Sequence, residues 1–408
     1  MRKIIKKLLG NISLNPFKFF LVMMFISYGF GFFISLIYLN DEYIAYSLST
    51  MAIILSGVFL FGSGWSIAKK ITIQPLSYNA CVKTSYIFTA IFLLSAYYIF
   101  SETPPAVFAN ILGTDMSASQ LRAAATKGKS GIDSIINGLF YASSYIGISF
   151  LALIFFFEER KFKWFVFFIV VFLLVLNGQK SRFLIPLLPI MILFIQNYKF
   201  KHVSRLIFIG AGTLFLLMLS LNFLEIGSNS GHHVIIDAQE RLTQGGRDLF
   251  AHQTPLKFII HRLIWVPYIT AIDWFRYIDT VLTENLMGAS IPIFSDIFGL
   301  ERINLDNAVF KFQFNVSLNS LGAANTFFAF DTIANFGYIG LLILSPIFGI
   351  IFGLIWKGLP RPFNLMIFLW LYSFQSSSFQ AIFLGGGMFI ILFLVLAKNI
   401  TKPRIRIR

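Results

Sequence analysis

About ten stretches of this chain are long and apolar, and no other feature of the sequence restricts the fold as strongly. A helix needs about 20 apolar residues to cross roughly 30 Å of hydrocarbon, or fewer where flanking side chains reach the surface. The stretches lie near residues 16–39, 43–68, 84–100, 138–157, 164–177, 183–197, 206–224, 332–356, 364–380 and 382–397. Only 12% of the residues are charged, about half the fraction usual in soluble proteins. We therefore expect an all-α, polytopic membrane helical bundle with about ten transmembrane helices.

Positive charge is concentrated in alternate loops between these stretches. The chain has 33 Lys and Arg against 18 Asp and Glu, a formal net charge of +15. Basic loops occur at residues 68–70, 158–163, 197–205, 357–361 and 398–408. Because Lys and Arg are enriched in cytoplasmic loops, we expect all of these loops, and both termini, in the cytoplasm. The charge then reflects topology and contact with an anionic lipid bilayer, and it indicates no nucleic-acid partner.

The predicted organisation is a single integral membrane domain over residues 1–408 with two long outer segments, 101–137 and 225–331. Long loops on a compact bundle often carry function, so we expect residues 225–331 to bear the active site. Within this segment, residues 254–282 are amphipathic and bear Trp and Tyr, as in helices that lie on a membrane surface. A short transmembrane pair broken at Pro267 is the alternative.

The segment NGQKSRFLIP, residues 177–186, joins two apolar stretches and carries two cations on the outer side. Since the linker is short, we expect Lys180 and Arg182 at the outer ends of the two helices, with Ser181 capping the second one. Free N–H groups at a helix start beside two cations form an anion site, and a diphosphate at the headgroup level would suit it. The alternative is that both cations only reach lipid phosphates.

The large outer segment adds guanidinium groups to this side through Arg247, Arg262 and Arg276. Arginine holds phosphate oxygens in a bidentate manner and stays charged, which a diphosphate leaving group requires. Each of these arginines could equally pair with a nearby Asp or Glu.

The candidate catalytic bases are Asp331 and His252. Asp331 stands just inside the outer start of a long apolar stretch, where a carboxylate could take a proton from a sugar hydroxyl or simply complement the helix dipole. His252 follows Asp248 by four residues and shares its face if this part is helical. The histidines and acids of residues 232–252 lack a compact ligand spacing, so we expect no metal site. The single cysteine, Cys81, excludes a disulfide within the chain.

Three segments resemble a known family, the Wzy-type oligosaccharide repeat-unit polymerases of bacteria. They are NGQKSRFLIPLL, HRLIWVPYITAIDWFRY in the large outer segment, and NTFFAFDTIANFGYIGLLI at the start of the eighth apolar stretch. The layout of many spans with a large outer loop in the second half is similar over essentially the whole chain. The resemblance implies a GT-C-like, metal-independent glycosyltransferase of the bacterial cytoplasmic (inner) membrane.

The reaction implied by this resemblance joins undecaprenyl-diphosphate-linked glycans, as donor and acceptor, into O-antigen or capsular polysaccharide at the outer face of the membrane. The lipid diphosphate of the growing chain leaves as a hydroxyl of the next unit attacks. The resemblance implies no cofactor, and it implies a chain-length regulator as a further partner. From the residues themselves, we expect this diphosphate to be bound by Lys180, Arg182, Arg247, Arg262 and Arg276.

We expect Asn325, Trp265 and Tyr268 to line the groove for the acceptor glycan, and residues 254–282 to form the floor of the site. The last of the three segments is also similar to O-antigen ligases, which typically carry a His before this Asn. Ala324 takes that position here, which argues against the ligase mechanism and leaves the base open between Asp331 and His252. The alternatives are the ligase and a lipid-linked oligosaccharide flippase or exporter, for which only YSFQSSSFQ, residues 372–380, offers a polar stripe.

Overall fold

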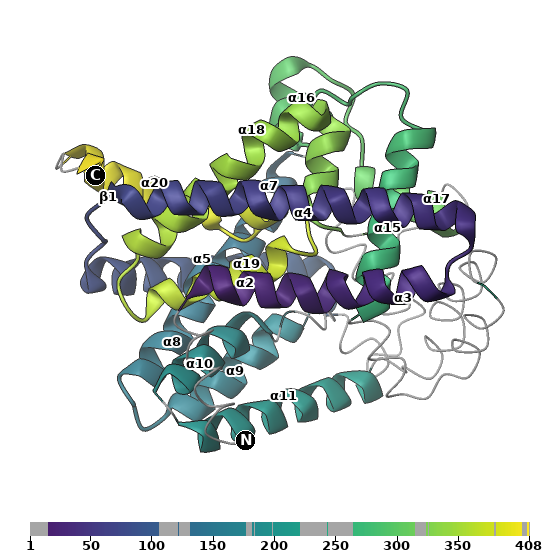
Figure 1. The fold of residues 1–408 in the computed structure, drawn as a ribbon. Helices are drawn as coiled ribbons and strands as arrows, with labels where there is room; N and C mark the ends of the chain where they lie inside the picture. Colours follow the sequence, from purple (N-terminus) through teal and green to yellow (C-terminus); the bar gives the residue numbers. More distant parts are fainter. Residues whose placement is uncertain are drawn as a thin grey trace.

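The computed structural model of the chain is mostly helical, in agreement with the predicted all-α membrane bundle (Figure 1). It describes residues 15–105, 121, 131–176, 182, 184–197, 199–220, 243, 264–314, 324, 326–378, 381–401 and 406–407. Each of the predicted apolar stretches lies at least partly on a described helix. The count of about ten membrane crossings stays a prediction, because several of these helices are short.

Five helical segments of the described chain are long and apolar enough to cross a membrane. Two of them are interrupted by π-helical turns, η1 and η3. The five are α2 (Pro16–Met24) with η1 (Phe25–Gly29) and α3 (Phe30–Tyr38); α4 (Asp41–Lys70); α5 (Tyr78–Glu102); α7 (Gly131–Ser143) with η3 (Ser144–Ile148) and α8 (Ser149–Phe157); and α18 (Phe328–Gly358).

Four shorter apolar segments are described besides α11 (Phe200–Ser220). They are α9 (Lys163–Val175); α10 (Leu184–Gln196); η7 (Phe363–Leu365) with α19 (Met366–Phe374); and η8 (Ala381–Gly385) with α20 (Met388–Thr401). The 13 residues of α9 and of α10 extend about 20 Å each, less than the roughly 30 Å of a hydrocarbon core. Each of these two helices is therefore shorter, as described, than a full crossing requires.

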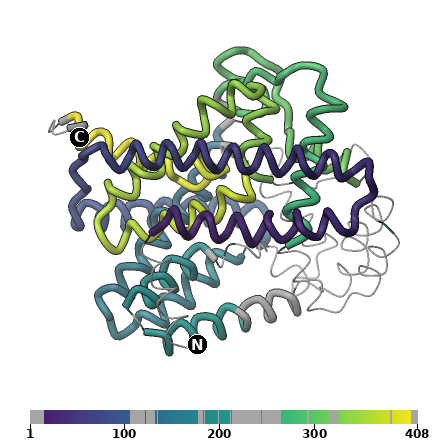
Figure 2. The backbone as a smooth tube through the Cα atoms, viewed as in Figure 1, coloured from purple at the N-terminus to yellow at the C-terminus, as the bar shows by residue number. Residues whose placement is uncertain are grey.

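The helices α4 and α18 pack closely along much of their length and form the spine of the bundle (Figure 2). Gly64 of α4 lies against the carbonyl of Pro346, and Gly349 of α18 lies against the carbonyl of Phe61. A Cβ at either glycine would come within 2.0 Å of those oxygens. Small residues are common where membrane helices approach this closely, because only they allow the backbones to touch.

The loops that carry the predicted inner charges contact one another at one end of the bundle, here called the basic end. Lys357 donates to the carbonyls of Ala68 and Lys69, and Lys199 pairs with Glu159. The two-residue strands β1 (Ile71–Thr72) and β2 (Arg406–Ile407) pair antiparallel at the same end. These contacts bring together loops that the sequence predicts to share one side of the membrane.

The opposite end, here called the distal end, carries the second half of the large outer segment. Of the helices of this segment, α15 (Val266–Thr280) and α17 (Leu305–Phe314) lie near the start of α4, and α16 (Pro292–Phe298) lies beside α18 (Figure 1). Tyr46 of α4 donates to the Asp279 carboxylate across this junction, at 3.3 Å. The site described below is formed here.

Candidate active site

A break in α18 fixes the geometry of the distal end. Gly337 has φ 66° and ψ −168°, a conformation open essentially to glycine alone, and it divides α18 into a short outer helix and a long inner one. The break leaves carbonyls just before it without partners in the helix. Leu286 N–H donates to the Ala334 carbonyl at 3.0 Å, and Met287 N–H to the Asn335 carbonyl at 2.8 Å. The loop before α16 is thereby held against the outer helix of α18.

Asp331 lies in the short outer helix and is buried, with only 6% of its surface exposed. The side-chain amide of Asn335, one turn later, donates to Asp331 Oδ1 at 3.1 Å and to Ser290 Oγ at 2.7 Å. The Ser290 hydroxyl lies 3.4 Å from the same carboxylate oxygen. The helix break and the loop that it holds therefore position the carboxylate predicted from the sequence.

A second carboxylate, Asp306, lies in the first turn of α17 and is partly buried. Asn304 begins this helix, and its side chain accepts from the N–H of Asn307 at 3.2 Å. Burial and the nearby negative charge of Asp331 raise the pKa of Asp306 to about 7. The two carboxylates thus interact across two helices, and the Asp306 side chain keeps its proton up to about neutral pH.

An apolar groove of about 430 Å³ starts at Asp331 and follows α18 toward the basic end. Asp331, Thr332 and Asn335 form its polar mouth, and Ile291 with Phe294 covers it from the side of α16. The rest of its lining consists of apolar side chains and one glycine of α18, as far as Ile351. Ile339 is 71% exposed, so this face of α18 is open to the lipid phase.

Arg276, predicted to bind diphosphate, lies in α15 among aromatic rings. Its guanidinium is centred 4.6 Å from the ring of Tyr43 and 5.5 Å from that of Phe312, and it pairs with Asp273 at 3.5 Å. Only 18% of the Arg276 side chain is exposed. Its charge is therefore shared with a buried carboxylate and with rings of α4 and α17.

Arg182 contacts two residues of the span formed by α7, η3 and α8. Its guanidinium donates to Ser144 Oγ at 2.9 Å and stacks over the Tyr141 ring at 4.1 Å. Ser144 begins the π-helical turn in the middle of a 23-residue span. The position of Arg182 at the outer surface of the membrane stays a prediction. A cation inside a membrane bundle is a functional candidate by default.

Trp265 and Tyr268, predicted to line a glycan groove, are both buried. The Tyr268 hydroxyl contacts Ser47 Oγ at 2.9 Å and donates to the Ser47 carbonyl at 2.7 Å, so it packs against α4. Neither residue lines the groove along α18. Ala324 is buried too, and its carbonyl accepts from Trp274 Nε1 at 2.7 Å.

Five predicted site residues lie outside the described residues: Lys180, Arg247, His252, Arg262 and Asn325. The same holds for Ser181, the predicted cap. Within the described ranges, no three His, Cys, Asp or Glu side chains are grouped so that they could hold a metal ion.

The function of this site is inferred from its own chemistry, because no protein-family profile, no curated protein and no solved structure matches this chain. The arrangement offers a buried, hydrogen-bonded carboxylate with a second one nearby, and a groove able to hold a lipid chain beside them. Sequence reasoning missed Asp306, for which the only signal is an Asn two residues earlier that could start a helix.

Proposed function

We propose that the protein is a membrane glycosyltransferase that joins polyprenyl-diphosphate-linked oligosaccharides into a polysaccharide at the distal end of the bundle. The observation that carries this proposal is the buried Asp331 at the mouth of an apolar groove, next to Asp306. A base buried beside a groove of the size of a lipid chain suits a reaction between a sugar hydroxyl and a lipid-linked substrate, because both can be held at one place. The resemblance to Wzy-type polymerases points the same way, with O-antigen or capsular polysaccharide as the product.

In the proposed step, Asp331 accepts the proton of the attacking sugar hydroxyl while that oxygen bonds to the anomeric carbon of the donor. The bond from this carbon to the diphosphate oxygen breaks, and the lipid diphosphate leaves with the electron pair. Cations must stabilise the charge on the leaving group. Arg182 and Arg276 are the described candidates, and the undescribed Lys180, Arg247 and Arg262 remain predicted members of this set.

The test of the base is Asp331→Asn in the native host, with Asp296→Asn as the matched control on exposed α16. We expect Asp331→Asn to lower polymer formation by about 10²-fold or more and to leave single-repeat glycan. Asp296→Asn keeps the full polymer. A normal polysaccharide ladder from Asp331→Asn, at equal protein in the membrane, would refute the assigned base.

A second candidate function, export of lipid-linked oligosaccharide, is favoured by interrupted helices in the middle of the bundle. The π-helical turns η1 and η3 interrupt two spans, and the hydroxyl of Tyr28 in η1 donates to the Gln375 carbonyl beyond α19. Broken helices at mid-depth are typical of transporter sites. Arg182→Ala separates the two functions: loss of polymer with retained single-repeat glycan supports the polymerase, and loss of both supports export.

A further inference from the structure

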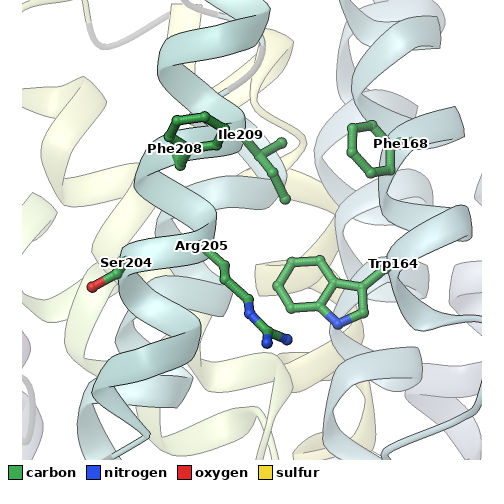
Figure 3. A pocket seen from close by; sticks show the side chains of 6 residues that line it. All are labelled: Trp164, Phe168, Ser204, Arg205, Phe208 and Ile209. Carbon is green, nitrogen blue, oxygen red and sulfur yellow. The ribbon is translucent and has the colours of Figure 1, made fainter.

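A second groove, of about 520 Å³, lies between α9 and α11 (Figure 3). Trp164 and Phe168 form its α9 wall, and Arg205, Phe208 and Ile209 lie on the α11 side. It is separate from the groove along α18, and no step of the proposed glycosyl transfer uses it. Its volume falls within the roughly 300–1,000 Å³ usual for small-ligand sites.

The groove has one charged end. Arg205 lies about 8 Å along α11 from its start at Phe200, and Trp164 is the second residue of α9, so both are near the basic end. In Figure 3 the Arg205 guanidinium points toward the Trp164 indole, while Phe168, Phe208 and Ile209 lie further along the helices. The cation and the indole lie at one end, and the apolar side chains lie beyond them. This order matches the order of a lipid, whose charged headgroup is followed by its acyl chain.

The charge at this end is strongly positive. Lys163, Lys199 and Arg205 are all near enough to act electrostatically on the ring of His202. Lys199 is paired with Glu159, whereas no described carboxylate lies within ion-pair distance of Lys163 or Arg205. Arg205, the cation that lines the groove, therefore has no ion-pair partner among the described residues, and Lys163 beside the groove acts on Glu159 only at longer range.

The walls of the groove are preformed on one side and open to lipid on the other. Trp164 stacks on Phe194 with centroids 6.4 Å apart and meets Phe156 edge-on at 5.1 Å, which fixes the indole. Phe208 is 81% exposed and Phe168 is 52% exposed. Exposed phenylalanines on membrane helices face acyl chains, so the groove opens sideways into the bilayer.

We propose that this groove binds one anionic phospholipid of the leaflet at the basic end. Its phosphate lies between Arg205 and Lys163, and an acyl chain lies along Phe168, Phe208 and Ile209. Charge complementarity selects an anionic headgroup, since basic pockets between membrane helices bind such headgroups. If the basic end is cytoplasmic, the lipid belongs to the inner leaflet.

The test uses the full-length protein in detergent, titrated with phosphatidylglycerol or with phosphatidylcholine of the same chains. Bound lipid is counted by native mass spectrometry, and the Tm is followed in parallel. We expect the wild type to retain one phosphatidylglycerol in preference to phosphatidylcholine, and its Tm to be higher with phosphatidylglycerol bound. Arg205→Gln weakens this binding about fivefold, the effect of one basic residue at an anionic surface.

The matched control is Lys70→Gln, which removes an exposed charge from α4 at the same end but outside the groove. Phe208→Ser reports separately on the acyl-chain wall and should lower the retention of both lipids. Equal retention of the two lipids by the wild type would overturn the proposal. So would equal effects of Arg205→Gln and Lys70→Gln, because a diffuse basic surface would then account for the binding. These measurements do not depend on polysaccharide synthesis.

Discussion

Asp306 and Asp331 are held near each other in a largely dehydrated environment, which sets their protonation. Removing a carboxylate from water disfavours its charged form, and a second carboxylate nearby disfavours it further. Both effects act on Asp306 and raise its pKa to about 7 from the ordinary value of 3.8. Near neutral pH the side chain is poised between its two forms, which suits a group that supports proton transfer.

This raised pKa predicts a specific pH dependence of stability. The folded state holds the Asp306 proton more tightly than the unfolded chain, so the stabilising contribution is complete below about pH 4 and is lost as the pH rises through about 7. Asp306→Asn cannot lose a proton. We expect the Tm of this variant, relative to wild type, to be higher at pH 8 than at pH 5.

The control for this titration is Asp296→Asn on exposed α16, whose Tm should follow the wild type at both pH values. A constant difference between Asp306→Asn and wild type across this range would show that Asp306 is ionised throughout.

At the scale of elements, the break in α18 connects backbone conformation to the site. Gly337 ends the short outer helix, and the carbonyls before the break hold the loop that brings Ser290 to Asn335. A Cβ at Gly337 would lie 3.1 Å from Asn285 Nδ2 in addition to straining the backbone. One glycine therefore maintains the contact between two segments that are far apart in the sequence.

Gly337→Ala should accordingly lower both stability and polymer formation, since its backbone conformation costs a residue with a side chain about 1–3 kcal/mol. The control is Gly299→Ala at the end of α16, where φ is also positive but the space is open. That variant should have a lower Tm than the wild type but form a normal amount of polymer. If both variants formed equal amounts of polymer, the break in α18 would not be required for the active site.

A second prediction concerns the contact between α4 and α18. Gly349→Ala places a methyl group against the Phe61 carbonyl, so the helices must move apart, at a cost of about 1–3 kcal/mol typical of overpacking. Gly138→Ala on α7, where no atom lies within 4 Å of the added Cβ, should cost nothing. The Tm of the two variants in detergent distinguishes a packing effect from a general intolerance of alanine.

At the scale of the whole molecule, charge separates the two ends. The basic loops contact one another at one end, while α15 and α17 lie near the start of α4 at the other (Figure 1). We predict that the protein inserts with its basic loops in the cytoplasm. The proposed glycosyl transfer and the proposed phospholipid site then lie on opposite sides of the bilayer.

This orientation is measured with single cysteines in a Cys81→Ala background, because the native Cys81 is buried. We expect Asp296→Cys at the distal end to react with a membrane-impermeant maleimide in intact cells. Lys70→Cys at the basic end should react only after permeabilisation. The reverse pattern would invert the topology and move the candidate active site to the cytoplasm.

The sequence alone predicts a helical membrane protein and indicates which loops lie together. Both properties depend on the local density of apolar and basic residues, because a bilayer requires about 20 apolar residues for a full crossing and distributes Lys and Arg by side. It also identified Asp331 as a carboxylate at the start of α18. These features can be read without knowing which segments touch.

The surroundings of Asp331 and Arg182 depend on tertiary contacts. Ser290 approaches Asp331 because Gly337 breaks α18 and frees carbonyls for a distant loop, and α17 brings Asp306 near the same carboxylate. Arg182 donates to Ser144 in the middle of another span, and no local pattern encodes either contact. Tyr268 belongs to a stretch that the sequence predicts to be amphipathic and to lie on the membrane surface, yet its hydroxyl is buried against Ser47. In each case the environment comes from residues far along the chain, which composition and periodicity do not report.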